Sequence, residues 1–236
     1  MLYHLVHDDK FIDIAYQRFE IVFPGMNCFI YPYGNTPTQY IHNPLIKLTA
    51  NETISFLNTN LGEKDLLIIH YLGFSKINII NKIEKKCHII WIGWGNDYYP
   101  LIVRNMNNLL LEGTKNLYLS GFSKTERLKN YIRTKFNPLS KLLLKVSKKI
   151  DYINTVIPDD YDLIKKNYPS FKPKYFSWNY GSISYLRPPD FQKSISKQNI
   201  LLGNSATPHN NHVEIIHFLS TLPLNDRKVI CPLNYG

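Results

Sequence analysis

The chain has 236 residues, of which 44% are hydrophobic and 19% charged, so it can bury a core and its composition excludes a disordered protein. Its 28 Lys and Arg residues outnumber 18 Asp and Glu residues and give a net charge of +10, which predicts attraction to nucleic acid, anionic membranes or phosphate groups. Three widely spaced cysteines, no secretory signal and no run of about 20 apolar residues favour a protein of a reducing compartment without a membrane span.

Strand-like and helix-like segments alternate along the chain, which predicts a parallel sheet covered by helices. The segment 10–23 has apolar residues at helical spacing, and Pro24-Gly25 ends it. The predicted strands of this first part are residues 2–7, 28–31, 66–70, 87–94, 149–156 and 174–178.

A basic region, residues 124–149, lies between the fourth and fifth predicted strands. It holds nine Lys or Arg residues against one acid, Glu126, and its leucines recur at helical spacing. Such a helix can lie on an anionic membrane surface. It can also be a solvated helix whose leucines face the core, and spacing alone favours this second interpretation.

The polar, Pro-containing segment 186–198 is typical of an interdomain linker. After it the sequence predicts a strand (199–202), a loop (203–209), a helix (210–220) and a strand (228–232). A doubly wound domain needs about five or six strands, so this β-α-β unit either extends the first sheet or begins a second domain. We favour the second: a domain over 1–185, the linker 186–198, and an incomplete domain over 199–236, which makes the sequence a fragment of a longer protein.

The loop of this β-α-β unit is the first candidate site. A turn of Gly203, Asn204 and Ser205 follows a buried strand, and Asn210 and His212 stand where the helix begins. Free backbone N–H groups and the positive end of the helix dipole would meet there, which favours a bound diphosphate. Asn210 would cap the helix and His212 would bond a phosphate oxygen. An ordinary loop with a polar cap is the alternative.

A second candidate is the aromatic run Trp91-Ile92-Gly93-Trp94-Gly95-Asn96-Asp97-Tyr98-Tyr99 at the end of the fourth strand. Aromatic faces stack on sugars, and Asp97 could accept a hydroxyl proton; a packed strand end is the alternative. His7, Asp9 and His70 follow other strands and could line the same cleft. 

Metal sites are disfavoured. His4 and His7 would point to opposite faces of a strand. The acids of Asp159-Asp160-Tyr161-Asp162 fit the first turn of a helix, and His209 with His212 lacks thiolate or carboxylate partners. The sequence therefore predicts no metal and no cofactor.

Three segments together resemble glycosyltransferase family 56: the Gly203-Asn204-Ser205 turn with Asn210-Asn211-His212, the run Trp94 to Tyr99, and the closing Val229-Ile230-Cys231-Pro232-Leu233-Asn234-Tyr235-Gly236. These are the TDP-N-acetylfucosamine:lipid II N-acetylfucosaminyltransferases of enterobacterial common antigen synthesis. The resemblance implies a GT-B fold, in which two Rossmann-like domains face each other, the first holding the lipid-linked acceptor and the second the nucleotide sugar. 

The resemblance also implies roles for residues. The chain departs from the common family pattern at Ala206-Thr207-Pro208-His209, which leaves the donor sugar open. On the donor side, the diphosphate would contact Gly203, Asn204, Ser205, Asn210 and His212; on the acceptor side, the cleft would be lined by Trp94, Gly95, Asp97 and Tyr99.

The expected reaction moves a deoxy-amino sugar such as N-acetylfucosamine from a TDP-sugar to an undecaprenyl-diphosphate-linked saccharide. Asp97, or less favourably Asp9, would orient or deprotonate the acceptor hydroxyl, and His212 would stabilise the leaving diphosphate. The basic segment 124–149 would hold a peripheral protein on the cytoplasmic face of the bacterial inner membrane.

Two other functions remain open at this point. A basic nucleic-acid-binding module would explain the net charge, but no helix-turn-helix, zinc-finger or RNP-type signature is present, so no nucleic-acid partner is predicted. The other is a truncated transferase without activity.

Overall fold

The computed structural model divides the chain into two compact units, unit 1 (Met1–Ile102 with Pro138–Leu186) and unit 2 (Val103–Asn137 with Arg187–Gly236). It describes residues 1–84, 86–103, 109–129, 138–181, 199–203 and 205–233.

Unit 1 is built on a seven-stranded sheet in the order β3-β2-β1-β4-β5-β6-β7, and each strand pairs in parallel with its neighbours. The strands are β1 (Leu2–Leu5), β2 (Asn27–Tyr31), β3 (Ile46–Lys47), β4 (Leu66–His70), β5 (His88–Ile92), β6 (Tyr152–Asn154) and β7 (Lys174–Tyr175). The predicted α/β class with a parallel sheet is confirmed.

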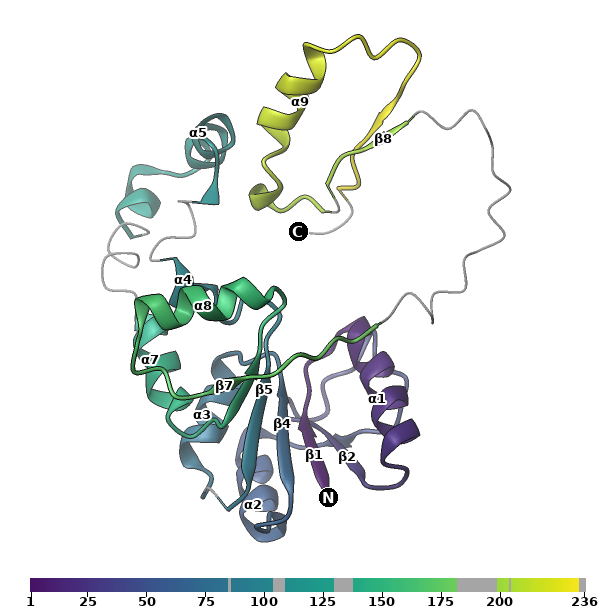
Figure 1. Ribbon diagram of the computed structural model, residues 1–236, viewed down its shortest axis with the longest axis vertical. Coiled ribbons are helices and arrows are strands. Elements are labelled where there is room, and N and C mark those ends of the chain that lie inside the picture. The colour runs from purple at the N-terminus through teal and green to yellow at the C-terminus, as the bar shows by residue number, and fades with distance from the viewer. Residues whose placement is uncertain (85, 104–108, 130–137, 182–198, 204, 234–236) are drawn as a thin grey trace. The chain divides into compact units, whose positions relative to one another are not determined.

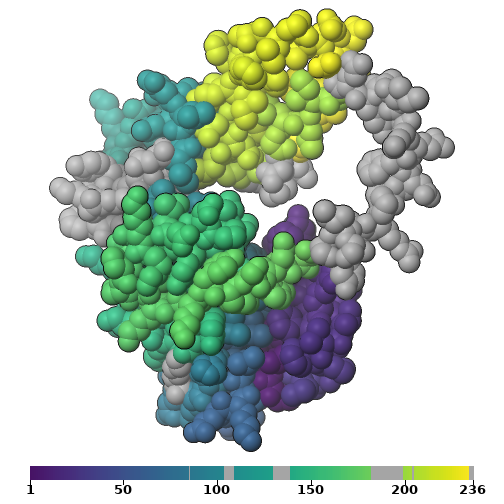
Figure 2. All heavy atoms as spheres, in the orientation of Figure 1, coloured from purple at the N-terminus to yellow at the C-terminus, as the bar shows by residue number. Residues whose placement is uncertain are grey.

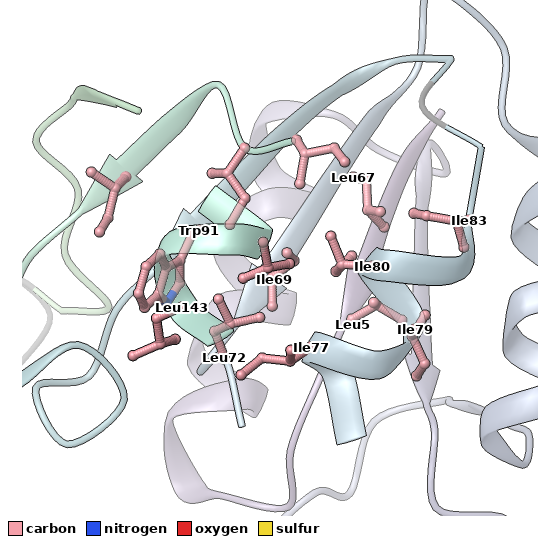
Figure 3. Close-up of a cluster of buried hydrophobic side chains, with 14 of the residues drawn as sticks. Leu5, Leu67, Ile69, Leu72, Ile77, Ile79, Ile80, Ile83, Trp91 and Leu143 are labelled. Carbon is pink, nitrogen blue, oxygen red and sulfur yellow. The ribbon is translucent and has the colours of Figure 1, made fainter. Parts of the chain in front are cut away.

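One face of this sheet is covered by α2 (Ala50–Asn60), α3 (Phe74–Lys82), α7 (Pro138–Ser147) and α8 (Pro158–Asn167). Leu5 on β1 pairs with Ile69 on β4, and both are fully buried there beneath α3. Figure 3 shows these side chains meeting the isoleucines of α3 and Leu143 of α7. Because successive strand residues point to opposite faces, this cluster uses every second position of β1, β4 and β5.

The opposite face is covered by α1 (Lys10–Val22) and by an aromatic segment, residues 176–180. This segment follows β7 and runs back across the sheet to α1, as the light-green chain shows in Figures 1 and 2. There Trp178 stacks on Phe19 of α1, with ring centroids 5.9 Å apart. A segment distant in sequence therefore covers strands that one helix alone would leave exposed.

Helix α7 carries the leucines of the basic region. Leu143 and Val146 are fully buried in the core, whereas Lys141, Lys145 and Lys148 are exposed. The core-facing interpretation is therefore confirmed for Leu143 and Val146, whereas Leu142 is 36% exposed. Part of the basic region, residues 130–137, lies outside the described residues.

The acidic run that follows β6 is structural. Asp159 and Asp160 lie in the first turn of α8, as expected. Asp160 also accepts a hydrogen bond from the hydroxyl of Tyr98 at 2.8 Å in a buried position.

Unit 2 contains a parallel pair, β8 (Ile200–Leu201) with β9 (Val229–Ile230), and helices α5 (Glu112–Ser120) and α9 (His212–Ser220). In the described residues β8 and β9 form a sheet of their own and do not extend the first sheet. Helix α5 is held to α9 because Glu214 accepts hydrogen bonds from both the backbone and the hydroxyl of Thr114.

These contacts group residues 103–137 with the C-terminal part of the chain, whereas the sequence boundaries place them in the first domain. The predicted linker 186–198 lies outside the described residues. Helix α9 begins two residues later than predicted, because a 3-10 turn (Pro208–Asn210) and a left-handed Asn211 precede it. Asn210 therefore does not cap α9, which corrects the sequence-based expectation.

Candidate functional site

The order of strands in unit 1 places a switch point between β1 and β4. After β1 the chain adds β2 and β3 on one side of the sheet, and after β4 it adds β5, β6 and β7 on the other side. In open α/β sheets, ligands bind at the carboxyl ends of the strands at such a point. The residues that follow these two strands, His7 after β1 and Tyr71 after β4, are therefore the first to consider.

A hydrogen-bonded cluster occupies this position. Nδ1 of His7 lies 3.3 Å from the hydroxyl of Tyr33, and the hydroxyl of Ser75 donates to the same phenol oxygen at 3.1 Å. The ring of His7 also contacts the ring of Tyr71, with centroids 5.6 Å apart. His7 and Tyr33 are half-buried, so they are partly open to solvent.

The backbone around Tyr71 is unusual. Tyr71 has φ +62°, in the left-handed region that aromatic residues rarely adopt, and such strained positions cluster at functional sites. The ammonium group of Lys76, fully buried on α3, donates to the carbonyls of His70 and Tyr71 and holds this turn. Burial lowers the pKa of Lys76 to about 7, although the Asp97 carboxylate opposes the shift.

Asp97 is a buried structural carboxylate. Its Oδ2 accepts from the backbone N–H of Leu72 at 2.8 Å and from the indole N–H of Trp91 at 2.7 Å, and its Oδ1 accepts from the backbone N–H of Trp94 at 2.8 Å. Burial raises the pKa of Asp97 against these hydrogen bonds. With only 4% of the residue exposed, this geometry favours a positioning role over proton exchange with a substrate.

The other residues of the aromatic run contribute differently. Trp94 is half-buried, and its ring packs 5.5 Å from that of Tyr71, which joins it to the switch-point cluster. Gly95 has φ +95°, and a Cβ there would lie 3.1 Å from the ring of Tyr99, so this turn requires glycine. Tyr99 begins α4 (Tyr99–Ile102) and stacks on Tyr98 beside the core.

His70 belongs to a buried chain of hydrogen bonds on the α1 face of the sheet. The Asn27 amide nitrogen donates to Glu20 and to the carbonyl of Phe23, so its oxygen must accept from Nε2 of His4, 3.3 Å away. Nδ1 of His4 then accepts from Nε2 of His70 at 3.0 Å.

The series of hydrogen bonds continues from His70 to Trp94, and each donor points toward His4. Nδ1 of His70 accepts from the hydroxyl of Tyr180 at 2.8 Å, and that oxygen accepts from the indole N–H of Trp94 at 2.6 Å. Every N–H and O–H donor of this hydrogen-bond chain therefore has an acceptor, provided that both imidazoles are neutral. Burial lowers the pKa of His4 to about 3 and holds the pKa of His70 well below its usual value. His70 is fully buried, so it acts on the site through Tyr180 and Trp94.

Asp9 is the N-cap of α1, where its Oδ1 accepts from the backbone N–H of Phe11 at 3.0 Å. It lies two residues beyond His7, and its negative charge raises the pKa of that imidazole. Asp9 therefore influences the site through its negative charge.

In unit 2 the turn after β8 meets the first residue of α9. Gly203 has φ +67°, and a Cβ there would lie 2.6 Å from Nε2 of His212. This Nε2 is buried and has no hydrogen-bond partner among the described residues. A buried polar atom without a partner costs free energy, so a bound group that supplied one would be stabilised.

The rest of the loop closes on itself. The side-chain nitrogen of Asn210 donates to the carbonyl of Ser205 at 2.9 Å and to its hydroxyl at 3.1 Å. Ser205 is buried, while Asn204 lies outside the described residues. The structure thus brings Gly203, Ser205, Asn210 and His212 together within unit 2, and His7, Trp94 and Asp97 together within unit 1.

Sequence reasoning missed Tyr33, Tyr71, Ser75 and Tyr180. A signal for Ser75 was present, because Gly73 between a buried strand and a helical run predicts a strand-to-helix turn at the sheet edge. In the described parts of both units, no group of three His, Cys, Asp or Glu residues is arranged to hold a metal ion.

The comparisons with known proteins found no match, whether among protein-family models, curated proteins or solved structures. None of the helices in the described ranges has the length and apolar content needed to cross a membrane.

Proposed function

We propose that this chain is a glycosyltransferase of the GT-B type that moves a deoxy-amino sugar from a TDP-sugar to an undecaprenyl-diphosphate-linked saccharide. In this proposal unit 1 binds the acceptor and unit 2 begins the domain that binds the donor. The observation that carries it is the buried Nε2 of His212 beside Gly203, which has no hydrogen-bond partner among the described residues. It lies at the start of a helix and the carboxyl end of a strand. Such a position suits a diphosphate oxygen.

The acceptor side is supported by the aromatic cluster at the switch point of unit 1. The half-buried rings of Tyr71 and Tyr33 contact His7, and Trp94 packs on Tyr71, so the cluster offers apolar faces and hydroxyl groups. Sugars present both C–H faces and hydroxyls, so this combination suits a saccharide.

Donor binding is tested by titrating the protein with TDP-N-acetylfucosamine. We expect His212→Ala to weaken binding roughly tenfold, because a hydrogen bond to a charged group contributes about 1.5–3 kcal/mol. Gly203→Ala should abolish it, because the added Cβ meets Nε2 of His212 at 2.6 Å. Calorimetry measures both affinities.

His217→Ala is the matched control, because His217 is exposed on the same helix. The proposal is overturned if the wild-type chain binds no TDP-sugar, or if His212→Ala and His217→Ala bind it equally well.

The lipid-linked acceptor requires a membrane contact, which we place on α7. Its exposed Lys141, Lys145 and Lys148 surround Leu142, which is 36% exposed. Lys149 does not belong to this surface, because its ammonium donates to three carbonyls at the end of α3 at 2.8–3.0 Å.

Reversing the three exposed charges by Lys141→Glu, Lys145→Glu and Lys148→Glu should weaken binding to phosphatidylglycerol vesicles roughly 100-fold, at about 1 kcal/mol per basic residue. Co-sedimentation measures the change. Lys47→Glu, Lys64→Glu and Lys166→Glu change the net charge equally at exposed positions elsewhere in unit 1. Equal losses in both triple variants would contradict a surface on α7.

A further inference from the structure

Tyr180 connects the aromatic segment that follows β7 to the switch point of unit 1. Its ring packs edge-on against the ring of Trp178, with centroids 4.4 Å apart, and lies 5.3 Å from the ring of Phe11. Its hydroxyl oxygen lies 2.8 Å from Nδ1 of His70 and 2.6 Å from the indole nitrogen of Trp94. A side chain that follows the edge strand β7 therefore reaches the carboxyl ends of β4 and β5.

The two hydrogen bonds of the Tyr180 hydroxyl have a fixed direction. An indole N–H can only donate, so the phenol oxygen accepts from Trp94. Burial raises the pKa of Tyr180, so the phenol keeps its proton. This proton is donated to Nδ1 of His70, because the neutral imidazole carries its own proton on Nε2, toward His4. The hydroxyl thus has both of its partners within the protein.

The bond to Tyr180 decides what Trp94 can offer to a ligand. The indole N–H already has its acceptor, so it is not available to donate to a bound molecule. The indole ring also meets the rings of Phe11 and Tyr71, with centroids 6.1 and 5.5 Å away, yet Trp94 is only half-buried. What it can still offer is ring surface, which suits an apolar C–H face better than a hydroxyl group.

We propose that Tyr180 is the positioning residue of the acceptor site: its hydroxyl holds the indole of Trp94 so that this ring stacks on the acceptor saccharide and donates no hydrogen bond to it. The inference rests on the proposed function, in which unit 1 binds the acceptor. Both residues lie in unit 1. Because Tyr180 belongs to the segment that follows β7, Trp94 is held only while this segment lies on the sheet.

The first test needs no substrate. The chain has three tryptophans, 91, 94 and 178, so a nitrogen-15 spectrum of the full chain shows three indole N–H signals, and Trp94→Phe identifies one of them. In Tyr180→Phe, we expect the indole N–H of Trp94 to exchange with water roughly tenfold faster, because its acceptor is gone. The Trp91 signal is the internal reference, because its indole N–H donates to Asp97.

Tyr71→Phe is the matched control for this exchange measurement. Its ring still packs on Trp94, and the hydroxyl that it loses interacts with Asn96, so the indole N–H of Trp94 should keep its wild-type exchange rate. The inference is overturned if Tyr180→Phe leaves this rate unchanged. It is also overturned if the indole N–H of Trp94 in the wild type exchanges as fast as that of a free indole.

The second test titrates the full chain with a saccharide, methyl β-N-acetylglucosaminide, whose equatorial substituents leave C–H faces open. In the wild type, the probe should shift the ring C–H signals of Trp94 without slowing the exchange of its indole N–H. Tyr180→Phe should bind the probe roughly tenfold more weakly. Tyr152→Phe should bind it like the wild type, because Tyr152 meets His88 at the start of β5, at the opposite end of the strands.

The outcomes separate this inference from the proposed function. If Tyr180→Phe binds the probe as well as the wild type does, or if the probe protects the indole N–H of Trp94 from exchange, the inference fails. If the wild-type chain binds no saccharide, the stacking role of Trp94 is wrong. The titration with TDP-N-acetylfucosamine then shows independently whether the proposed function stands.

Discussion

Replacing Asp97 by alanine should destabilise unit 1 by roughly 3–5 kcal/mol. Two buried donors, the backbone N–H of Leu72 and the indole N–H of Trp91, and the partly buried backbone N–H of Trp94 would lose their acceptor. An unsatisfied buried donor costs about 1–3 kcal/mol. Asp97→Asn should cost less, because its amide oxygen can still accept from two of the three.

Tryptophan fluorescence during urea unfolding measures this loss for unit 1 alone, because all three tryptophans, 91, 94 and 178, lie in that unit. Asp162→Ala, at an exposed position on α8, should stay within about 0.5 kcal/mol of the wild type. If Asp97→Ala unfolds like the wild type and loses transferase activity, Asp97 is the catalytic carboxylate that the sequence suggests.

Asp97 also shows what the sequence leaves undetermined. A carboxylate after an aromatic strand fits both a substrate site and a buried turn. The three donors that distinguish these cases come from two loops and a strand, and they meet only when β4 and β5 pair. The spacing of residues along the sequence does not reveal that these three donors come together around Asp97.

The sheet itself was predictable, because its strands are continuous apolar runs. Leu66–His70 reads as a strand buried on both faces, and β4 has these bounds. Helix α3 was not predicted, although α9, which has the same length of nine residues, was. Short helices depend on tertiary packing more than on local propensity.

The candidate site was predictable in part. His7 and Trp94 were found because they follow strands, and the carboxyl ends of parallel strands share one edge. Tyr33 and Ser75 were missed because they lie far apart in the sequence, Tyr33 in the loop after β2 and Ser75 in the first turn of α3. Their hydrogen bonds, from Ser75 to Tyr33 and between Tyr33 and His7, depend on the order of β2, β1 and β4.

The paired histidines also depend on register. His4 lies opposite Ile68, two residues before His70, so both imidazoles point to the α1 face. The alternation of side chains along a strand predicts only that each histidine lies on a buried face of the sheet. Their mutual hydrogen bond at 3.0 Å requires β1 and β4 to be neighbours in this register.

This histidine pair should make unit 1 acid-sensitive well above the range where carboxylates titrate. The pKa of each imidazole is lowered in the folded state, to about 3 for His4 and well below its usual value for His70. The unfolded chain therefore binds more protons below pH 6.5, and stability falls as the pH falls. For two groups, the loss between pH 7.5 and 5 is about 4 kcal/mol, because the slope rises toward 1.36 kcal/mol per group and pH unit as the unfolded imidazoles become protonated.

The charges that face the pair act in the same direction. Burial lowers the pKa of His70, and the nearby His4 and Lys76 of α3 lower it further. The carboxylate of Glu20 reaches His4 only through the Asn27 amide. Protonation of His70 at Nδ1 would also leave the hydroxyl proton of Tyr180 without its present acceptor and loosen the 176–180 segment.

Urea unfolding followed by tryptophan fluorescence from pH 7.5 to 5 measures the effect. His4→Gln should roughly halve the slope of unfolding free energy against pH, whatever its effect on stability at pH 7.5, because one of two titrating groups is gone. His217→Gln removes an exposed imidazole of unit 2 and should leave the slope measured for unit 1 unchanged. An unchanged slope in His4→Gln would mean that the buried pair is not neutral, and the directional chain from Trp94 to Asn27 would then be wrong.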